Sequence, residues 1–61
     1  MILTRIIKKD LSEVQVIEPP RHISDKILHS HLVIKVHNRH NKSVLVYIDD
    51  IASFNITVEV E

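Results

Sequence analysis

Apolar and polar residues alternate along much of the chain, which is the period expected of half-buried β-strands. The alternation is clearest in residues 32–37 and 44–48, which are separated by the polar segment Asn38–Lys42. This arrangement predicts a β-hairpin with a polar loop, in which Val36 lies opposite Val44.

That register gives the predicted hairpin two different faces, because directly opposed residues of an antiparallel pair share a face. The core face would hold six apolar residues: Leu32, Ile34, Val36, Val44, Val46 and Ile48. The second face would pair Val33 with Tyr47, Lys35 with Leu45 and His31 with Asp49. A half-apolar second face suits another layer or another subunit better than bulk water, so we expect Val33, Lys35, Leu45 and Tyr47 to form a partner or oligomer interface.

Three further segments carry a strand pattern. Residues 2–8 and 13–17 predict a first and a second strand, the latter ended by Pro19 and Pro20 because proline cannot donate to a central ladder. A final strand has Phe54, Ile56, Val58 and Val60 on its apolar face. Between this strand and the hairpin, the Asp49–Asp50 pair predicts a tight turn or a single helical turn.

Residues 24–30 offer the one candidate helix. Ser24 would be its N-cap, and Ile23 would pack on Leu28 as a hydrophobic staple. The alternative, that residues 26–37 form one long strand, stays open. Because the chain has no glycine, left-handed turn positions should fall on Asn38, Asn41, Asn55 or Asp50.

The apolar residues are dominated by ten isoleucines and eight valines, whose branched side chains favour strands over helices. We therefore predict a mostly β fold, a small single-domain antiparallel sheet or barrel of about five strands over residues 1–61, with a short helix near 24–30 as an open alternative.

A chain of 61 residues buries only about 60% of the surface that its unfolded form exposes, so its core gives a thin margin of stability. Small domains usually add disulfides, a metal or a second subunit, and this chain has no cysteine. We therefore expect a homodimer.

Lysine and arginine interrupt the short apolar stretch at the start, which is not the order of a secretory signal, and this favours a cytoplasmic protein without membrane contact.

The net charge of zero conceals an asymmetry. Residues 1–42 carry eight basic and four acidic side chains, so their net charge is +8 − 4 = +4, whereas residues 43–61 carry four acidic side chains and no base. Opposite charges could attract within one chain or between two. Strong electrostatic capture of nucleic acid is disfavoured, since such domains usually have a marked basic excess.

Five histidines are many for so short a chain, but they give only a weak metal signal. If residues 29–31 were strand, His29 and His31 would point to one side, and Asp49 could add a carboxylate ligand. A His-x-His pair is more often two surface residues, so we expect no metal and no other cofactor.

With no cysteine nucleophile, no glycine-rich loop and little room for a pocket, we expect no enzymatic activity and no small-molecule substrate.

Three short segments resemble, in the same order, stretches of the carbon storage regulator family: Ile2–Arg5, Glu13–Val16 and Val44–Ile51. The family consists of small RNA-binding proteins that form strand-swapped β dimers. The resemblance implies that Arg5 is a candidate RNA contact. The chain departs from the family pattern at Ile48, where the family has an arginine, and in its lack of glycine.

These observations predict a non-enzymatic regulatory or inhibitory binding protein that acts as a homo-oligomer on a protein partner, of the kind that phages and other mobile elements encode. The alternative is an RNA-binding translational regulator that resembles the carbon storage regulators and uses Arg5 and Lys35.

Overall fold

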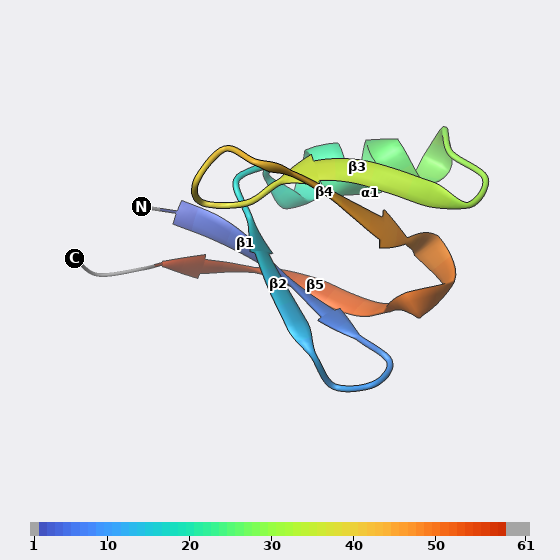
Figure 1. The fold of residues 1–61 in the computed structure, drawn as a ribbon, viewed down its shortest axis with the longest axis horizontal. Helices are drawn as coiled ribbons and strands as arrows, with labels where there is room; N and C mark the ends of the chain where they lie inside the picture. Colours follow the sequence, from blue (N-terminus) through green and yellow to red (C-terminus); the bar gives the residue numbers. More distant parts are fainter. Residues whose placement is uncertain (1, 59–61) are drawn as a thin grey trace.

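The computed structural model describes residues 2–58. These residues form five strands and one α-helix, with a 3-10 turn before the last strand, and their arrangement can be followed in Figure 1. In chain order these are β1 (Ile2–Lys8), β2 (Glu13–Val16), α1 (Pro20–Leu28), β3 (Val33–His37), β4 (Ser43–Tyr47), η1 (Ile48–Asp50) and β5 (Ile51–Val58). The predicted mostly β fold is confirmed, and so is the single helical turn at Asp49–Asp50.

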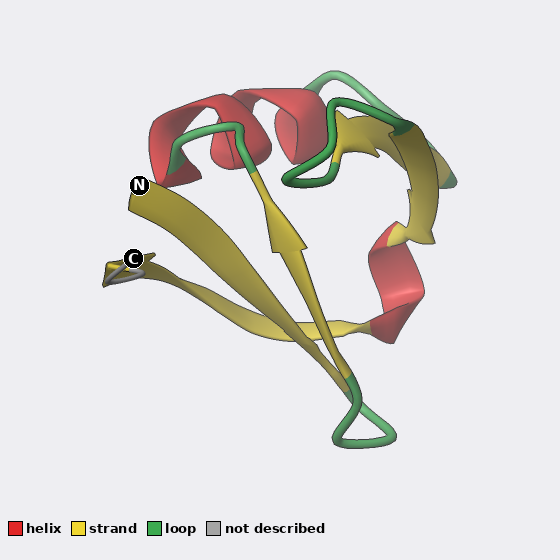
Figure 2. Cartoon of the chain, turned by 60° about the vertical axis from the view of Figure 1, so that its left-hand side comes forward, coloured by secondary structure: helices red, strands yellow, loops and turns green. Residues whose placement is uncertain are grey.

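The strands form two antiparallel sheets. One has the order β2-β1-β5 and the other consists of the β3–β4 hairpin. An isolated bridge between Val16 and Asn38 joins the end of β2 to the end of β3. Both views of the chain show the hairpin and α1 lying over the same side of the three-stranded sheet (Figure 1, Figure 2).

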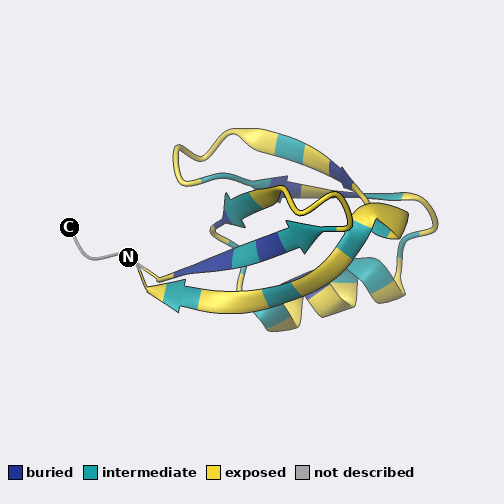
Figure 3. Ribbon diagram, turned by 90° about the horizontal axis from the view of Figure 1, so that it is seen from below, coloured by how far each residue is buried: buried dark blue, intermediate teal, exposed yellow. Residues whose placement is uncertain are grey.

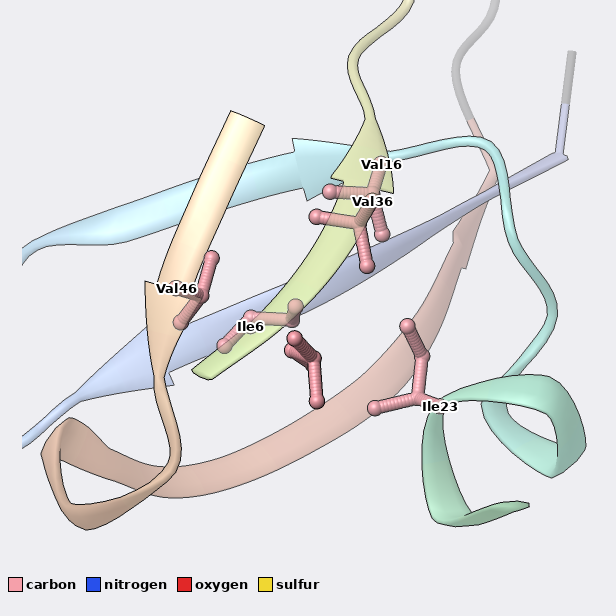
Figure 4. Packing of buried hydrophobic residues seen from close by; sticks show 6 residues of the cluster. Ile6, Val16, Ile23, Val36 and Val46 are labelled. Atoms are coloured by element: carbon pink, nitrogen blue, oxygen red, sulfur yellow. The ribbon is translucent and has the colours of Figure 1, made fainter. Parts of the chain in front are cut away.

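One apolar cluster fills the space between these layers, and six fully buried residues from five elements form it (Figure 4): Ile6, Val16, Ile23, Ile34, Val36 and Val46. Half-buried Ile51 and Phe54 of β5 pack against them. Burying a side chain of this size is worth about 1.5–3 kcal/mol, so every layer of the fold depends on the others for its stability.

The helix begins earlier than the sequence predicts, at Pro20, with Pro19 in an extended conformation as its N-cap. A first-turn proline costs the helix nothing, because the N–H group that it lacks would have no partner there. The predicted N-cap at Ser24 is therefore wrong, as is the long strand over residues 26–37. The predicted staple is wrong too, since Ile23 is buried but Leu28 is 76% exposed.

The loop of the β1–β2 hairpin contains a left-handed residue that the sequence analysis did not predict. Leu11 has a φ of 74°. Its N–H donates to the carbonyl of Lys8, and the Lys8 N–H donates to the carbonyl of Ser12. This is the hydrogen-bond pattern of a three-residue loop with a bulge, whose left-handed position is normally glycine.

The final strand differs from prediction in its start and in its burial. It begins at Ile51, three residues before Phe54. Ile56 and Val58 lie on the same side of the sheet as Phe54 but are 62% and 66% exposed. The cluster therefore ends at Phe54, and the predicted position Val60 lies outside the described residues.

Candidate interaction face

The outer face of the β3–β4 hairpin carries the four residues predicted to form an interface. Val33 lies opposite Tyr47, and Lys35 lies opposite Leu45, which confirms the predicted register. Leu45 is 63% exposed and Tyr47 is 55% exposed. We name Val33, Lys35, Leu45 and Tyr47 the hairpin face. It presents two large apolar side chains and one ammonium group to solvent.

The opposite side of the hairpin holds this face in place. Ile34, Val36 and Val46 alternate with the residues of the hairpin face and are fully buried in the core cluster. Because successive strand residues point to opposite faces, the buried set fixes the orientation of the exposed set. A rigid face binds with a smaller loss of conformational entropy than a mobile loop.

The predicted hairpin extends too far at its open end. Leu32 was expected in the core but is 61% exposed, because β3 begins at Val33. The two segments are still joined beyond the end of the strands, since the Ile48 N–H donates to the Leu32 carbonyl at 2.9 Å. Asp49 belongs to η1 rather than to β4, so the predicted pairing of His31 with Asp49 is wrong.

The loop that closes the hairpin has the same hydrogen-bond pattern as the β1–β2 loop. Asn41 takes the left-handed position with a φ of 61° and donates its N–H to the Asn38 carbonyl. The Asn38 side-chain oxygen accepts from the N–H groups of His40 and Lys42. Of the candidate left-handed residues, Asn41 is confirmed and the other three are wrong.

Glu18 connects the two sheets beside this hairpin. One carboxylate oxygen accepts the backbone N–H of His37 at 2.9 Å, and the other lies 2.8 Å from the Nδ1 atom of the His37 ring. The Glu18 carbonyl accepts the hydroxyl of buried Thr4, and the N–H of the preceding Ile17 donates to the His37 carbonyl. We call this set of contacts the Glu18 junction.

Burial of the Glu18 carboxyl favours its neutral form and raises its pKa, but the hydrogen bonds from the His37 ring and backbone favour the ionised form and prevail. The pKa of Glu18 is therefore below its ordinary value. On the first hairpin loop, the Ser12 hydroxyl and N–H hold the pKa of Asp10 below its ordinary value as well.

Arg5, the candidate RNA contact, lies on the central strand of the three-stranded sheet. Its register partners are Gln15 and Asn55. Its Nε atom is 3.7 Å from a carboxylate oxygen of Glu13, and this atom has no hydrogen-bond partner. Lys35 belongs to the other sheet, so the two candidate RNA contacts come from different layers of the fold.

The weak metal candidates are not brought together. His29 is the C-cap of α1 rather than a strand residue, so the spacing argument for His29 and His31 fails. Among residues 2–58 no group of three or more histidine, cysteine or acidic side chains could hold a metal ion. This part of the chain contains no detectable pocket, and none of its helices is long and apolar enough to cross a membrane.

In comparisons with known proteins, no family model, no curated protein and no solved structure matches the chain.

Two features of the described surface and its supporting contacts were not predicted from the sequence. The first is the Glu18 junction, which joins residues 19 positions apart, and no local pattern could have indicated it. The second is an exposed apolar patch, Ile2, Ile56 and Val58, in which Ile2 lies opposite Val58. Its signal was present in the alternation of the final strand, but alternation alone cannot show where the covering layer ends.

Proposed function

We propose that this chain is a non-enzymatic regulatory or inhibitory protein that acts as a homo-oligomer and docks on a protein partner through the hairpin face. The observation that carries the proposal is the exposure of Leu45 and Tyr47 side by side on a strand pair whose other side is locked into the core.

The composition of this face supports a protein ligand. Tyrosine provides a large contact area at a small cost in side-chain entropy, and it is enriched among the residues that dominate interface energies. Leu45 and half-buried Val33 extend the apolar surface, and exposed Lys35 adds one positive charge. This combination fits an apolar patch on the partner that has a carboxylate at its rim.

Face-directed variants test the proposal. Affinity capture from extract of the native host compares the wild-type chain with the double variant Leu45→Ser, Tyr47→Ser, using nuclease-treated and untreated extract. The matched control is Leu28→Ser, Leu32→Ser, which removes two similarly exposed leucines elsewhere. We expect a protein that survives nuclease treatment to be retained by the wild type and the control and lost from the face variant.

Two results would overturn the proposal. Retention of the same protein by the face variant would show that the hairpin face is not the docking surface. Capture of RNA that disappears with nuclease and weakens strongly with salt would favour the RNA-binding alternative, and an Arg5→Ala variant would then test the contact that the family resemblance implies.

A further inference from the structure

The outer edge of β5 is the longest unpaired strand edge in the described part of the chain. In the order β2-β1-β5, one side of β5 is bonded to β1, and no described strand lies on its other side. The strand runs for eight residues, Ile51–Val58. An exposed row of backbone N–H and C=O groups of this length is a template for pairing with another chain.

The second half of the strand lacks the charges, prolines and bulges that proteins use to protect such an edge. Residues 51–58 contain no lysine, no other charged residue and no proline. Its one irregularity of register lies near Lys8, at its start, and the pairing from Ile2↔Val58 to Ile7↔Ser53 is continuous. The second half of β5 is therefore regular, uncharged and unprotected.

The exposed apolar patch adjoins this half of the strand. Ile2, Ile56 and Val58 are 68%, 62% and 66% exposed. They share one face of the sheet, because Ile2 is the register partner of Val58, and Thr4 is the partner of Ile56. The burial colours of Figure 3 show exposed positions along β5 up to its end. A partner strand at this edge would cover apolar side chains as well as backbone groups.

We infer that the second half of β5 pairs antiparallel with β5 of a second copy of the chain, about a two-fold axis near Ile56. The inference assigns a contact surface to the homo-oligomer of the proposed function, so it rests on the homo-oligomer part of that proposal. It also leaves the hairpin face available for the protein partner.

The absence of charged residues from β5 favours a second copy of the chain as the partner that pairs with this edge. A two-fold axis places residues beside their own copies, so a charged strand would repel itself. With the axis at Ile56, Ile56 faces its own copy, Phe54 faces Val58, and Asn55 faces Thr57, so apolar residues meet apolar ones and polar residues meet polar ones. The net charge of zero adds no long-range repulsion between copies.

The expected affinity is modest. One strand edge and three exposed side chains fall at or below the roughly 1,200 Å² of total buried area that marks weak complexes. We therefore expect a dissociation constant in the micromolar range, which sedimentation velocity measures across about 5 to 500 µM.

Charge placed at the axis provides the decisive experiment. Ile56→Lys and Ile56→Glu should each weaken self-association by about tenfold or more, since each places like charges opposite one another. An equimolar mixture of the two variants should associate again, because a lysine then faces a glutamate. Leu45→Lys, on the hairpin face, is the matched control and should dimerise like the wild type. Circular dichroism verifies that each variant is folded.

A second measurement uses the absence of cysteine. Ile56→Cys should form a disulfide-linked dimer under mild oxidation, and Leu45→Cys should not. The inference is overturned if the wild type is monomeric throughout the concentration range, if the mixture does not associate, or if Leu45→Lys rather than the Ile56 variants abolishes the dimer. None of these measurements involves the protein partner, so they fail independently of the docking proposal.

Discussion

Glu18 and His37 are 19 residues apart in the chain and are joined by two contacts, one to the backbone N–H of His37 and one to its ring. The contact pair links the end of β2 to the end of β3, beside the isolated bridge between Val16 and Asn38. Glu18 therefore helps to position the hairpin, and with it the hairpin face, over the three-stranded sheet.

This relationship predicts a dependence of stability on acidity. Because the pKa of Glu18 is lower in the folded chain than in the unfolded chain, the stabilisation is fully present above the ordinary value of 4.5 and is lost as the pH falls through the lower folded value. Asp10 acts with the same sign. Urea denaturation at a series of pH values should show a falling free energy of unfolding below about pH 4.5.

The variant Glu18→Gln separates the contribution of Glu18 to the pH dependence of stability from the contribution of Asp10. Hydrogen bonds to a charged group contribute about 1.5–3 kcal/mol, so we expect the variant to be less stable than the wild type by about 1–2 kcal/mol at neutral pH, with an allowance for partial solvent access. The two stabilities should converge in acid, where the wild-type carboxyl is also neutral. A difference that stays constant down to the lowest pH would contradict the assigned role.

The hairpin shows what a sequence can predict well. Its register follows from a period of two, a polar loop and one Val–Val pairing, and the buried residues Ile34, Val36 and Val46 lie where that pattern puts them. The error at Leu32 arises because a pattern does not state where a strand begins. The backbone bends before Val33, and a residue outside the ladder need not follow its alternation.

The helix and the Glu18 junction show the limits. Pro19 and Pro20 were interpreted only as the end of a strand, although proline at the first helical position also marks a helix start. The junction depends on how β2 and β3 meet in space, which is a tertiary relationship between residues with no local signal. The hairpin face was predicted because it lies within one hairpin, whereas the exposed patch combines Ile2 with Ile56 and Val58 from the other end of the chain.

The two hairpin loops make a matched pair for a backbone prediction. Both have a residue in the left-handed region. Asparagine adopts this conformation readily, whereas for most residues, leucine included, it costs about 1–2 kcal/mol. Leu11 is 86% exposed, so its side chain offers little in compensation. We expect Leu11→Asn to stabilise the chain by about 0.5–1 kcal/mol and Asn41→Leu to destabilise it by about 1 kcal/mol, measured by urea denaturation. Destabilisation by Leu11→Asn would show that the leucine makes a contact that outweighs its strain.

Thr4 is the one buried polar side chain in the described residues, and its hydroxyl donates to the Glu18 carbonyl. Thr4→Val keeps the shape of the side chain but leaves that carbonyl without its donor. We expect a loss of about 1–3 kcal/mol in the free energy of unfolding, the usual cost of a buried unsatisfied group. Thr4→Ser retains the hydroxyl and should lose about 1 kcal/mol through its missing methyl group alone. Equal losses in the two variants would assign no role to the hydrogen bond.

Ile23 is the only residue of α1 that is fully buried, so the attachment of the helix to the rest of the fold depends on it. Its side chain packs in the core cluster among residues of both sheets (Figure 4). Ile23→Ala should cost about 2–5 kcal/mol, because it removes buried carbon atoms and leaves a cavity. In a chain of this size such a loss approaches the whole stability, so the measurement needs a stabilising osmolyte. Leu28→Ala, on the exposed side of the same helix, should change the stability by less than about 0.5 kcal/mol. A similar cost for the two substitutions would mean that the helix packs through a different face from the one described.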